Sequence, residues 1–443
     1  MKKNEYGLFT AITMIVGIVI GSGIFFKSDN ILVATGGSIS LGVLVFCLAA
    51  IAIIFGSLTI SELASRISQP GGIIAYAEES YNKSVACAFG WFQTFLYFPT
   101  LIAVVAWVAG IYFCMLFGLD STLNVQILIG LAIIIVLFIT NTISAKLGGY
   151  FQNVSTIIKL IPLIFIAIVG LIFGDVSNIS FSDITTMKSI GWITAIAPIA
   201  FSFDGWVVST SIGHEIKDSK RNLPKALIIA PIFILLVYIA YFVGISTYLG
   251  PDVVMNLGDG HVDLIANKLL GQFGAKIVLI FVIISIIGTV NGLILGLIRL
   301  PYSLAIREMF PGSKKISKLD EKINMPLNSA LVAFALCIFW TVAHYFTTKL
   351  GLLYNSDISE ISITISYVMY ILLYIKVFKL GREGEVKGLW RGTINPILAI
   401  IGSLIILIGS LGNELFWIYA SVCGVIILSS IIFWKKRSEK LME

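Results

Sequence analysis

The sequence predicts an all-α integral membrane protein with both termini in the cytoplasm. Of its 443 residues, 58% are hydrophobic and only 12% are charged, whereas about a quarter of a soluble domain is charged. Apolar runs of about 20 residues recur along the chain, and each is long enough to cross a hydrocarbon core of roughly 30 Å as a helix. A helix satisfies its own backbone hydrogen bonds in lipid, so these runs are predicted to be helical.

Twelve apolar runs are predicted to span the membrane, and no change of composition marks a soluble domain. They cover residues 8–27, 40–63, 87–115, 124–141, 150–173, 191–212, 227–249, 275–298, 327–346, 357–375, 394–412 and 415–434. We therefore expect residues 1–443 to form a single membrane domain.

Basic residues predict which side each loop faces. With a cytoplasmic N-terminus, most of the 30 Lys and Arg residues fall in segments that would also be cytoplasmic. Cytoplasmic loops are enriched in these residues, which places both termini in the cytoplasm of a multi-pass cell-membrane protein. The asymmetry explains the net charge of +6, so no nucleic acid partner is expected.

The first span is interrupted by "IGSGI" at residues 20–24. A break at Gly21 to Gly23 frees carbonyls at the end of one half-helix and amides at the start of the next, and glycine supplies the necessary backbone freedom. Freed amides suit a carboxylate and freed carbonyls suit an ammonium group, and an α-amino acid carries both. The other interpretation is a small-residue packing face of the GxxxG kind, formed by Gly17 and Gly21.

The sixth span is interrupted in the same way by "FSFDGW" at residues 201–206, with Gly205 at the break. An ionised Asp204 at this depth costs roughly 2.5 to 3.5 kcal/mol on insertion scales, so burial without a role is not expected. Three roles stay open: protonation, pairing with a substrate ammonium, or capping of the freed amides together with Ser202.

The two interruptions are five helices apart. An odd-numbered repeat reverses its orientation in the membrane, so residues 8–173 and 191–375 are predicted to form an inverted 5+5 pair, with helices 11 and 12 at 394–434 appended. Interrupted spans in corresponding positions are typical of a transporter's binding site.

Lys159 is the one basic residue that lies deep within a span. Its side chain could extend to the cytoplasmic interface. Alternatively, carbonyls near Gly17 and Ile20 could accept hydrogen bonds from its ammonium group, which would then replace a bound cation. A third interpretation is that Lys159 releases and takes up a proton during transport.

No signature of catalysis or metal binding was found. The three histidines lie at span ends or in loops without an HExxH motif, and the five cysteines lack CxxC spacing. We therefore expect no enzyme, cofactor or metal site. A channel would show a continuous polar stripe along several helices, whereas the deep polar residues here concentrate at the two breaks.

Four segments resemble the amino acid, polyamine and organocation (APC) transporter superfamily. They are "IVIGSGIFF", "ELASRISQPGGIIAYAEESY", "FSFDGW" and "GHEIKDSKRNLPKAL". Within the superfamily the chain is similar to bacterial members of the L-type amino acid transporter family. The resemblance implies twelve helices, discontinuous helices 1 and 6, and alternating access without sodium coupling.

The resemblance also implies roles for residues at the breaks. Amides of Ser22, Gly23 and Ile24 would bind the substrate carboxylate, and carbonyls of Val19 and Phe201 would bind its ammonium group. Lys159 would fill the space of a sodium ion, beside Gly17, Ile20 and Thr289. Asp204 stands where several relatives have glycine. The full set of substrate-binding residues is Val19, Ser22, Gly23, Ile24, Phe201, Ser202, Phe203 and Asp204, with Gly21, Gly23 and Gly205 as the broken-helix glycines.

The expected function is sodium-independent exchange of small or medium neutral L-amino acids. The alternative is proton-coupled symport that uses Lys159 or Asp204. Animal members bond a glycoprotein partner through a cysteine in the loop after helix 3. Because the corresponding loop here, roughly 116–123, has no cysteine, no such partner is expected.

Overall fold

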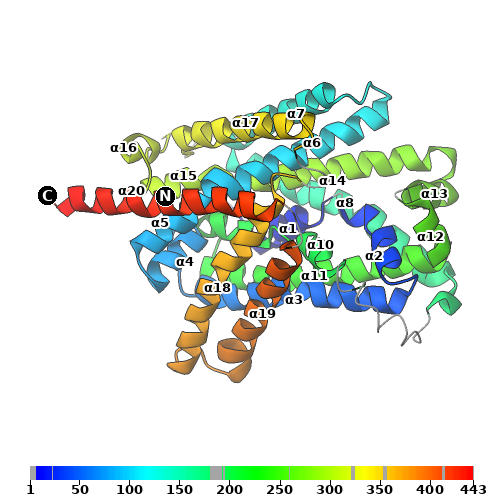
Figure 1. Ribbon diagram of the computed structural model, residues 1–443, viewed down its shortest axis with the longest axis horizontal. Helices are drawn as coiled ribbons and strands as arrows, with labels where there is room; N and C mark the ends of the chain where they lie inside the picture. The colour runs from blue at the N-terminus through cyan, green and yellow to red at the C-terminus, as the bar shows by residue number, and fades with distance from the viewer. Residues whose placement is uncertain are drawn as a thin grey trace.

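The computed structural model describes residues 6–21, 23–179, 192, 195–258, 260–320, 325–352, 357–411 and 415–442. Every named element in these ranges is helical, and the pair Tyr6–Ile216 forms an isolated β-bridge. Most long helices run along the long axis of the molecule, and α18 and α19 cross it steeply (Figure 1). The predicted all-α architecture is confirmed.

Ten helices within the described ranges are long and apolar enough to cross a membrane. They correspond to ten of the predicted spans, and the two left over, 8–27 and 191–212, are those predicted to be interrupted. The long helices are α3 (Ile39–Ala64), α5 (Lys83–Phe92) continued by η2 (Gln93–Tyr97) and α6 (Phe98–Phe117), α7 (Leu123–Ile143), α8 (Ala145–Phe173), α11 (Ser219–Leu249), α13 (Gly260–Leu270) continued by η6 (Gly271–Phe273), α14 (Gly274–Leu297) and α15 (Arg299–Ala305), α17 (Leu327–Lys349), α18 (Glu360–Arg382), η7 (Trp390–Ile394) with α19 (Asn395–Ser410), and α20 (Phe416–Met442).

Both interrupted segments consist of short helical pieces. The first contains α1 (Leu8–Val19), η1 (Gly23–Phe26) and α2 (Ser28–Ala34). The second contains α10 (Ile196–Phe201) and the 3₁₀ helix η5 (Trp206–Glu215). Between them Gly205 has a φ of 100°, which glycine adopts without the steric cost that a side chain would add.

The interrupted segments lie inside the bundle. α1 packs against α8, α11 and α14, and α10 packs against α3 and α19. α8 and α11 approach closely because Gly170 faces the backbone of Gly244, where a Cβ atom would collide. Such small-residue contacts are a usual means of helix association in membranes.

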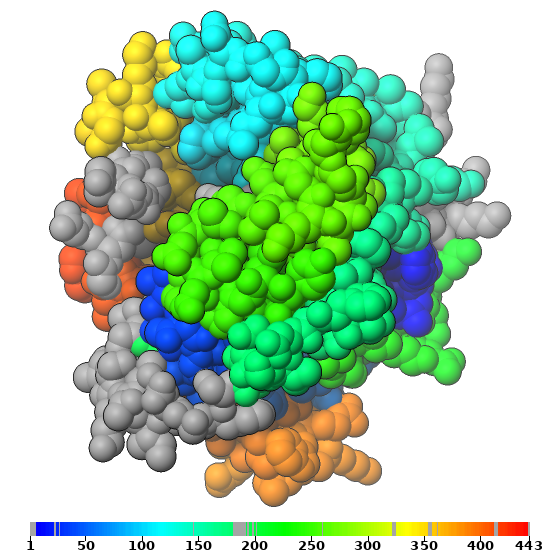
Figure 2. Space-filling view, turned by 90° about the vertical axis from the view of Figure 1, so that its right-hand side faces the viewer, coloured from blue at the N-terminus to red at the C-terminus, as the bar shows by residue number. Residues whose placement is uncertain are grey.

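The two ends of the bundle differ in chemistry. All ion pairs between described residues lie at the end where α3 and η5 terminate, close to α4 (Ile73–Ser80) and α16 (Ser313–Ile316). At the other end, on the right of Figure 1, α12 (Pro251–Leu257) and α13 bury Val254, Val262 and Ile265. Residues of this region fill the centre of the face in Figure 2.

Candidate functional site at the two broken helices

The break in the first segment leaves carbonyl groups without helical partners. The last helical bond runs from Ile20 N to Val16 O (2.9 Å), and Ile20 is extended with φ −75° and ψ 92°. Gly21 N then donates to Val19 O (2.9 Å) instead of Gly17 O. The carbonyls of Gly17, Ile18 and Ile20 therefore need hydrogen-bond donors from elsewhere, since lipid offers none.

Lys159, on α8, supplies most of those partners. Its ammonium nitrogen Nζ donates to Gly17 O (2.6 Å) and Ile20 O (2.7 Å), and it lies 3.4 Å from Thr289 Oγ1 on α14. An ammonium group has three N–H donors, and this arrangement gives each one an oxygen. The side chain is fully buried, so the ammonium group does not extend to the interface.

Hydroxyl groups of α14 complete the arrangement. Thr289 Oγ1 also donates to Gly17 O (3.1 Å) and lies 3.4 Å from Ile18 O. Ser285 Oγ lies 3.4 Å from Ile20 O. Backbone and hydroxyl oxygens thus surround one positive charge, as they would surround a bound metal cation.

Tyr238, on α11, connects the two breaks. Its hydroxyl lies 3.1 Å from Val19 O and 3.0 Å from Ser202 O. A phenol has a single proton, so it can donate to only one of these carbonyls at a time. Tyr238 therefore competes for the carbonyl of Val19, which is one of the two that the resemblance assigns to an ammonium group. One turn further, Tyr241 donates to Phe25 O (3.0 Å) and ties η1 to the same helix.

Asp204 faces a different set of helices. Its Oδ2 accepts a hydrogen bond from Tyr97 (2.6 Å), which ends the π-helical turn η2, and such turns occur frequently at functional sites. Its Oδ1 is buried and has no hydrogen-bond partner within the described part of the chain. Nearby, Trp206 Nε1 donates to the hydroxyl of Tyr367 on α18 (3.3 Å). The amide of Gly205 and the hydroxyl of Tyr367 also lie near the Asp204 carboxylate, but neither forms a well-aligned hydrogen bond to Oδ1.

Some predicted residues contact one another directly, and others lie around the two breaks. Lys159 contacts Gly17, Ile20 and Thr289 directly. Around the breaks, a Cβ atom on Gly205 would meet Ile18, so the two interruptions face each other. The remaining predicted residues are Ile24 and Phe203, which are buried in the core beside the breaks, and Gly21 and Gly23, which flank Ser22. Ser22 and the side chain of Phe201 lie outside the described residues.

Sequence reasoning missed three tyrosines and one serine at these breaks: Tyr97, Tyr238, Tyr367 and Ser285. Their signal is weak, because a tyrosine in an apolar span usually contributes its ring to packing. A hydroxyl group buried in lipid nevertheless needs a partner, so tyrosines deep in apolar spans could have been marked as candidates.

The second half-helix of the broken pair is anchored at its far end. Glu215, the last residue of η5, accepts two hydrogen bonds from Arg299, at 2.8 and 3.0 Å. Tyr6 N donates to Glu215 O (3.2 Å), and Lys217 N donates to Tyr6 O (2.8 Å). Burial raises the pKa of Glu215, but the positive charge of Arg299 outweighs this, and the pKa lies below its ordinary value. Glu215 therefore links the start of the chain, η5 and α15.

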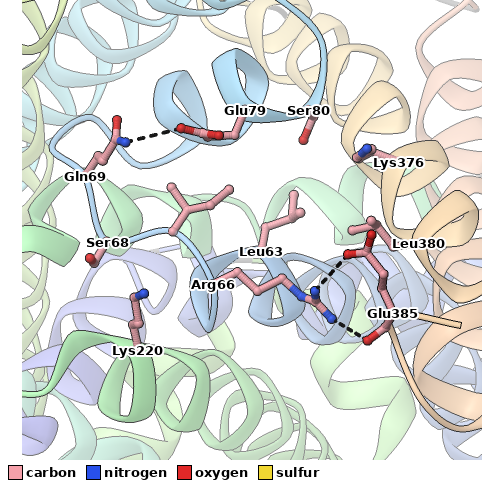
Figure 3. A pocket seen from close by; sticks show the side chains of 11 residues that line it. Leu63, Arg66, Ser68, Gln69, Glu79, Ser80, Lys220, Lys376, Leu380 and Glu385 are labelled. Carbon is pink, nitrogen blue, oxygen red and sulfur yellow. Dashed lines mark hydrogen bonds and ion pairs between the residues drawn. The ribbon is translucent and has the colours of Figure 1, made fainter. Parts of the chain in front are cut away.

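A separate polar cavity of about 470 Å³ lies at the same end of the bundle (Figure 3). Arg66 forms an ion pair with Glu385 at 3.3 Å on one side, and Gln69 donates to Glu79 at 3.2 Å on another. None of the predicted site residues lines this cavity. It is therefore not part of the arrangement at the breaks.

Comparisons with known proteins agree on one family. The family model described as "Amino acid permease" matches residues 6–435. The chain is 30% identical over 433 residues to "Serine/threonine exchanger SteT" of Bacillus subtilis (strain 168), covering 96% of this chain and 94% of the relative. It is 27% identical over 445 residues to "b(0,+)-type amino acid transporter 1" of Mus musculus, covering 98% and 87%.

A solved structure also shares the fold. "Crystal structure of MhsT in complex with L-phenylalanine" matches with a TM-score of 0.61 at 16% identity, covering 91% of this chain and 97% of that one. At this identity the likeness concerns the fold alone.

Proposed function

Because the chain belongs to the amino acid permease family, we propose that it is a sodium-independent exchanger of small or medium neutral L-amino acids. Membership of this family makes it a multi-pass membrane transporter of amino acids and not an enzyme. The exchange mode and the substrate size are the proposal, which the name of the serine/threonine exchanger supports.

The contact of Lys159 with the broken helix carries the proposal. Its ammonium group holds the carbonyls of Gly17 and Ile20 at 2.6 and 2.7 Å. A sodium ion at this place would need the same oxygens and would meet a positive charge within a few ångströms. Since like charges in a buried site repel strongly, Lys159 excludes the ion whose gradient would drive sodium symport.

The substrate is proposed to lie between the breaks. Amides of Ser22, Gly23 and Ile24 would bind its carboxylate, and the carbonyls of Val19 and Phe201 would bind its ammonium group. Tyr238 supports this arrangement because its one proton leaves Val19 O or Ser202 O free to accept from a ligand.

Asp204 narrows the substrate class. Its buried Oδ1 has no partner among the described residues, and a hydroxyl group on the substrate side chain would donate to it. A hydrogen bond to a charged acceptor contributes about 1.5 to 3 kcal/mol. We therefore expect serine and threonine to be preferred over alanine and valine by about tenfold or more.

The proposed architecture has twelve membrane helices, with residues 8–173 and 191–375 as inverted repeats and 394–434 appended. Ten long helices and the two broken segments support this count. Both termini are proposed to face the cytoplasm of the cell membrane, at the end that holds the ion pairs. A glycoprotein partner is not proposed, because the loop at 116–123 has no cysteine.

Uptake into proteoliposomes tests the mode of transport. Labelled serine would be offered to vesicles that are empty or preloaded with unlabelled serine, with sodium and pH gradients imposed separately. If the protein is an exchanger, uptake will require preloaded serine, and its rate will not change with either gradient. Uptake into empty vesicles driven by an inward proton gradient would instead establish proton symport, for which the buried Asp204–Tyr97 pair is the observation in favour.

A further inference from the structure

An apolar crease runs between α7 and α17 on the outside of the bundle. The two helices lie side by side (Figure 1) and present matching stripes of apolar residues, yet they leave a cavity of about 510 Å³ between them. Its floor contains Ala330 and the rings of Phe138 and Phe334, whose centroids are 5.3 Å apart. Ile135, Ile139, Ile143 and Leu331 line it and are exposed. In a membrane, lipid covers such a surface.

The length of the crease suits an acyl chain. Ile135 and Ile143 are eight residues apart on α7, which is about 12 Å along a helix. One leaflet contributes about 15 Å of hydrocarbon, half of the roughly 30 Å core. A partner helix would need a groove across both leaflets, so the dimensions favour one lipid chain from one leaflet.

Positive charge gathers at one end of the crease. Lys146 follows Ile143 by three residues, and Lys314 and Lys315 lie on α16, just before α17. Asn328 Nδ2 donates to Lys315 O (2.8 Å), which holds α16 against the first turn of α17. All three lysines are exposed, and none forms an ion pair with another described residue.

We propose that this crease binds one anionic phospholipid, with an acyl chain along α7 and α17 and the headgroup phosphate near Lys146 and Lys315. Thr142, the polar residue of the lining, lies at the lysine end and can donate to a phosphate or ester oxygen. Basic pockets between helices commonly bind anionic headgroups. The lysines therefore select the headgroup, while the apolar stripes retain the chain.

Native mass spectrometry of the purified full chain in detergent tests headgroup selection. Phosphatidylglycerol and phosphatidylcholine with identical acyl chains would be titrated in parallel. Each lysine near a headgroup strengthens binding roughly fivefold, so the double variant Lys146→Gln, Lys315→Gln is expected to bind phosphatidylglycerol at least tenfold more weakly. Phosphatidylcholine binding should change little. The matched control is Lys435→Gln, Lys436→Gln, which removes two lysines from α20, far from the crease along the chain.

A second variant tests the chain site separately. Ala330→Phe fills the floor of the crease and should weaken binding of both lipids, whereas Leu236→Phe, on an exposed position of α11, should not. Thermal unfolding in detergent without added lipid would verify that each variant folds. Glycerol 3-phosphate alone should not bind measurably if the acyl chain is required.

Three results would overturn the proposal. They are equal affinity for the two lipids in the parent chain, unchanged phosphatidylglycerol binding in the lysine variant, and equal losses in that variant and its α20 control. Binding of glycerol 3-phosphate with the affinity of the lipid would show a phosphate site without a chain site.

Discussion

Replacing Lys159 by methionine tests the central contact of the site. Methionine is similar in length but cannot donate a hydrogen bond, so the carbonyls of Gly17 and Ile20 lose their charged partner. Hydrogen bonds to charged groups contribute about 1.5 to 3 kcal/mol each, so the gross loss is about 3 to 6 kcal/mol. Removal of a buried ammonium group also relieves a desolvation cost of several kcal/mol.

The net effect follows from these opposing contributions. We expect the arrangement of α1 needed for transport to lose about 1.5 to 3 kcal/mol of stabilisation, which corresponds to an exchange rate roughly 10- to 150-fold lower. Lys159→Gln should retain more activity, because its shorter amide can still donate to one carbonyl.

Exchange of labelled against unlabelled serine in proteoliposomes measures the effect, at matched amounts of folded protein. Lys276→Met is the control, because Lys276 lies exposed on α14. Wild-type rates in Lys159→Met would refute the reasoning, since the ammonium group would then have no part in transport. A rate lowered to the same extent in Lys276→Met would show that the effect is not specific to the buried site.

Three further substitutions probe the neighbouring contacts. Tyr238→Phe removes the hydroxyl shared by Val19 O and Ser202 O. The apparent KM for serine should then change by about threefold to tenfold while the protein stays folded. An unchanged KM would place Tyr238 outside the substrate site. Asp204→Asn keeps an acceptor for Tyr97 but removes the charge, so competition assays should show a smaller preference for serine over alanine. The pKa of Glu215 is lowered in the folded protein, so its ion pair with Arg299 stabilises the fold at pH values above the ordinary glutamate pKa of 4.5. This stabilisation is lost as the pH falls through the folded-state pKa of Glu215. Melting temperatures should therefore converge for wild type and Glu215→Gln at low pH and differ near pH 7.

The interruptions of the two spans were predictable because their cause is local. Glycines at 21, 23 and 205 weaken a helix wherever they lie in an apolar run, and Gly205 indeed adopts a positive φ. The position of Lys159 within its span was predictable by counting residues, but the sequence left open whether its side chain extends to the cytoplasmic interface, and the structure shows it buried. The roles of these residues in transport stay predictions.

The partners of the buried hydroxyl groups were not predictable. Tyr238 and Val19 are 219 residues apart, and Tyr97 and Asp204 are 107 residues apart. The sequence shows that a buried hydroxyl needs an acceptor, but only the packing of α11 and η2 against the breaks decides which one. The carboxylate of Asp204 could be placed at its depth, whereas its direction toward Tyr97 on η2 depends on the turn at Gly205.

The unequal chemistry of the two ends has a kinetic consequence. In the alternating-access cycle that we expect from the resemblance, opening the end that holds Glu215 and Arg299 would bring paired charges into water. Dissolved salt, with a screening length of about 8 to 10 Å, would then weaken their attraction. Opening the end covered by α12 and α13 exposes apolar surface instead, which carries a large change in heat capacity. One half of the cycle should therefore respond mainly to ionic strength, and the other mainly to temperature.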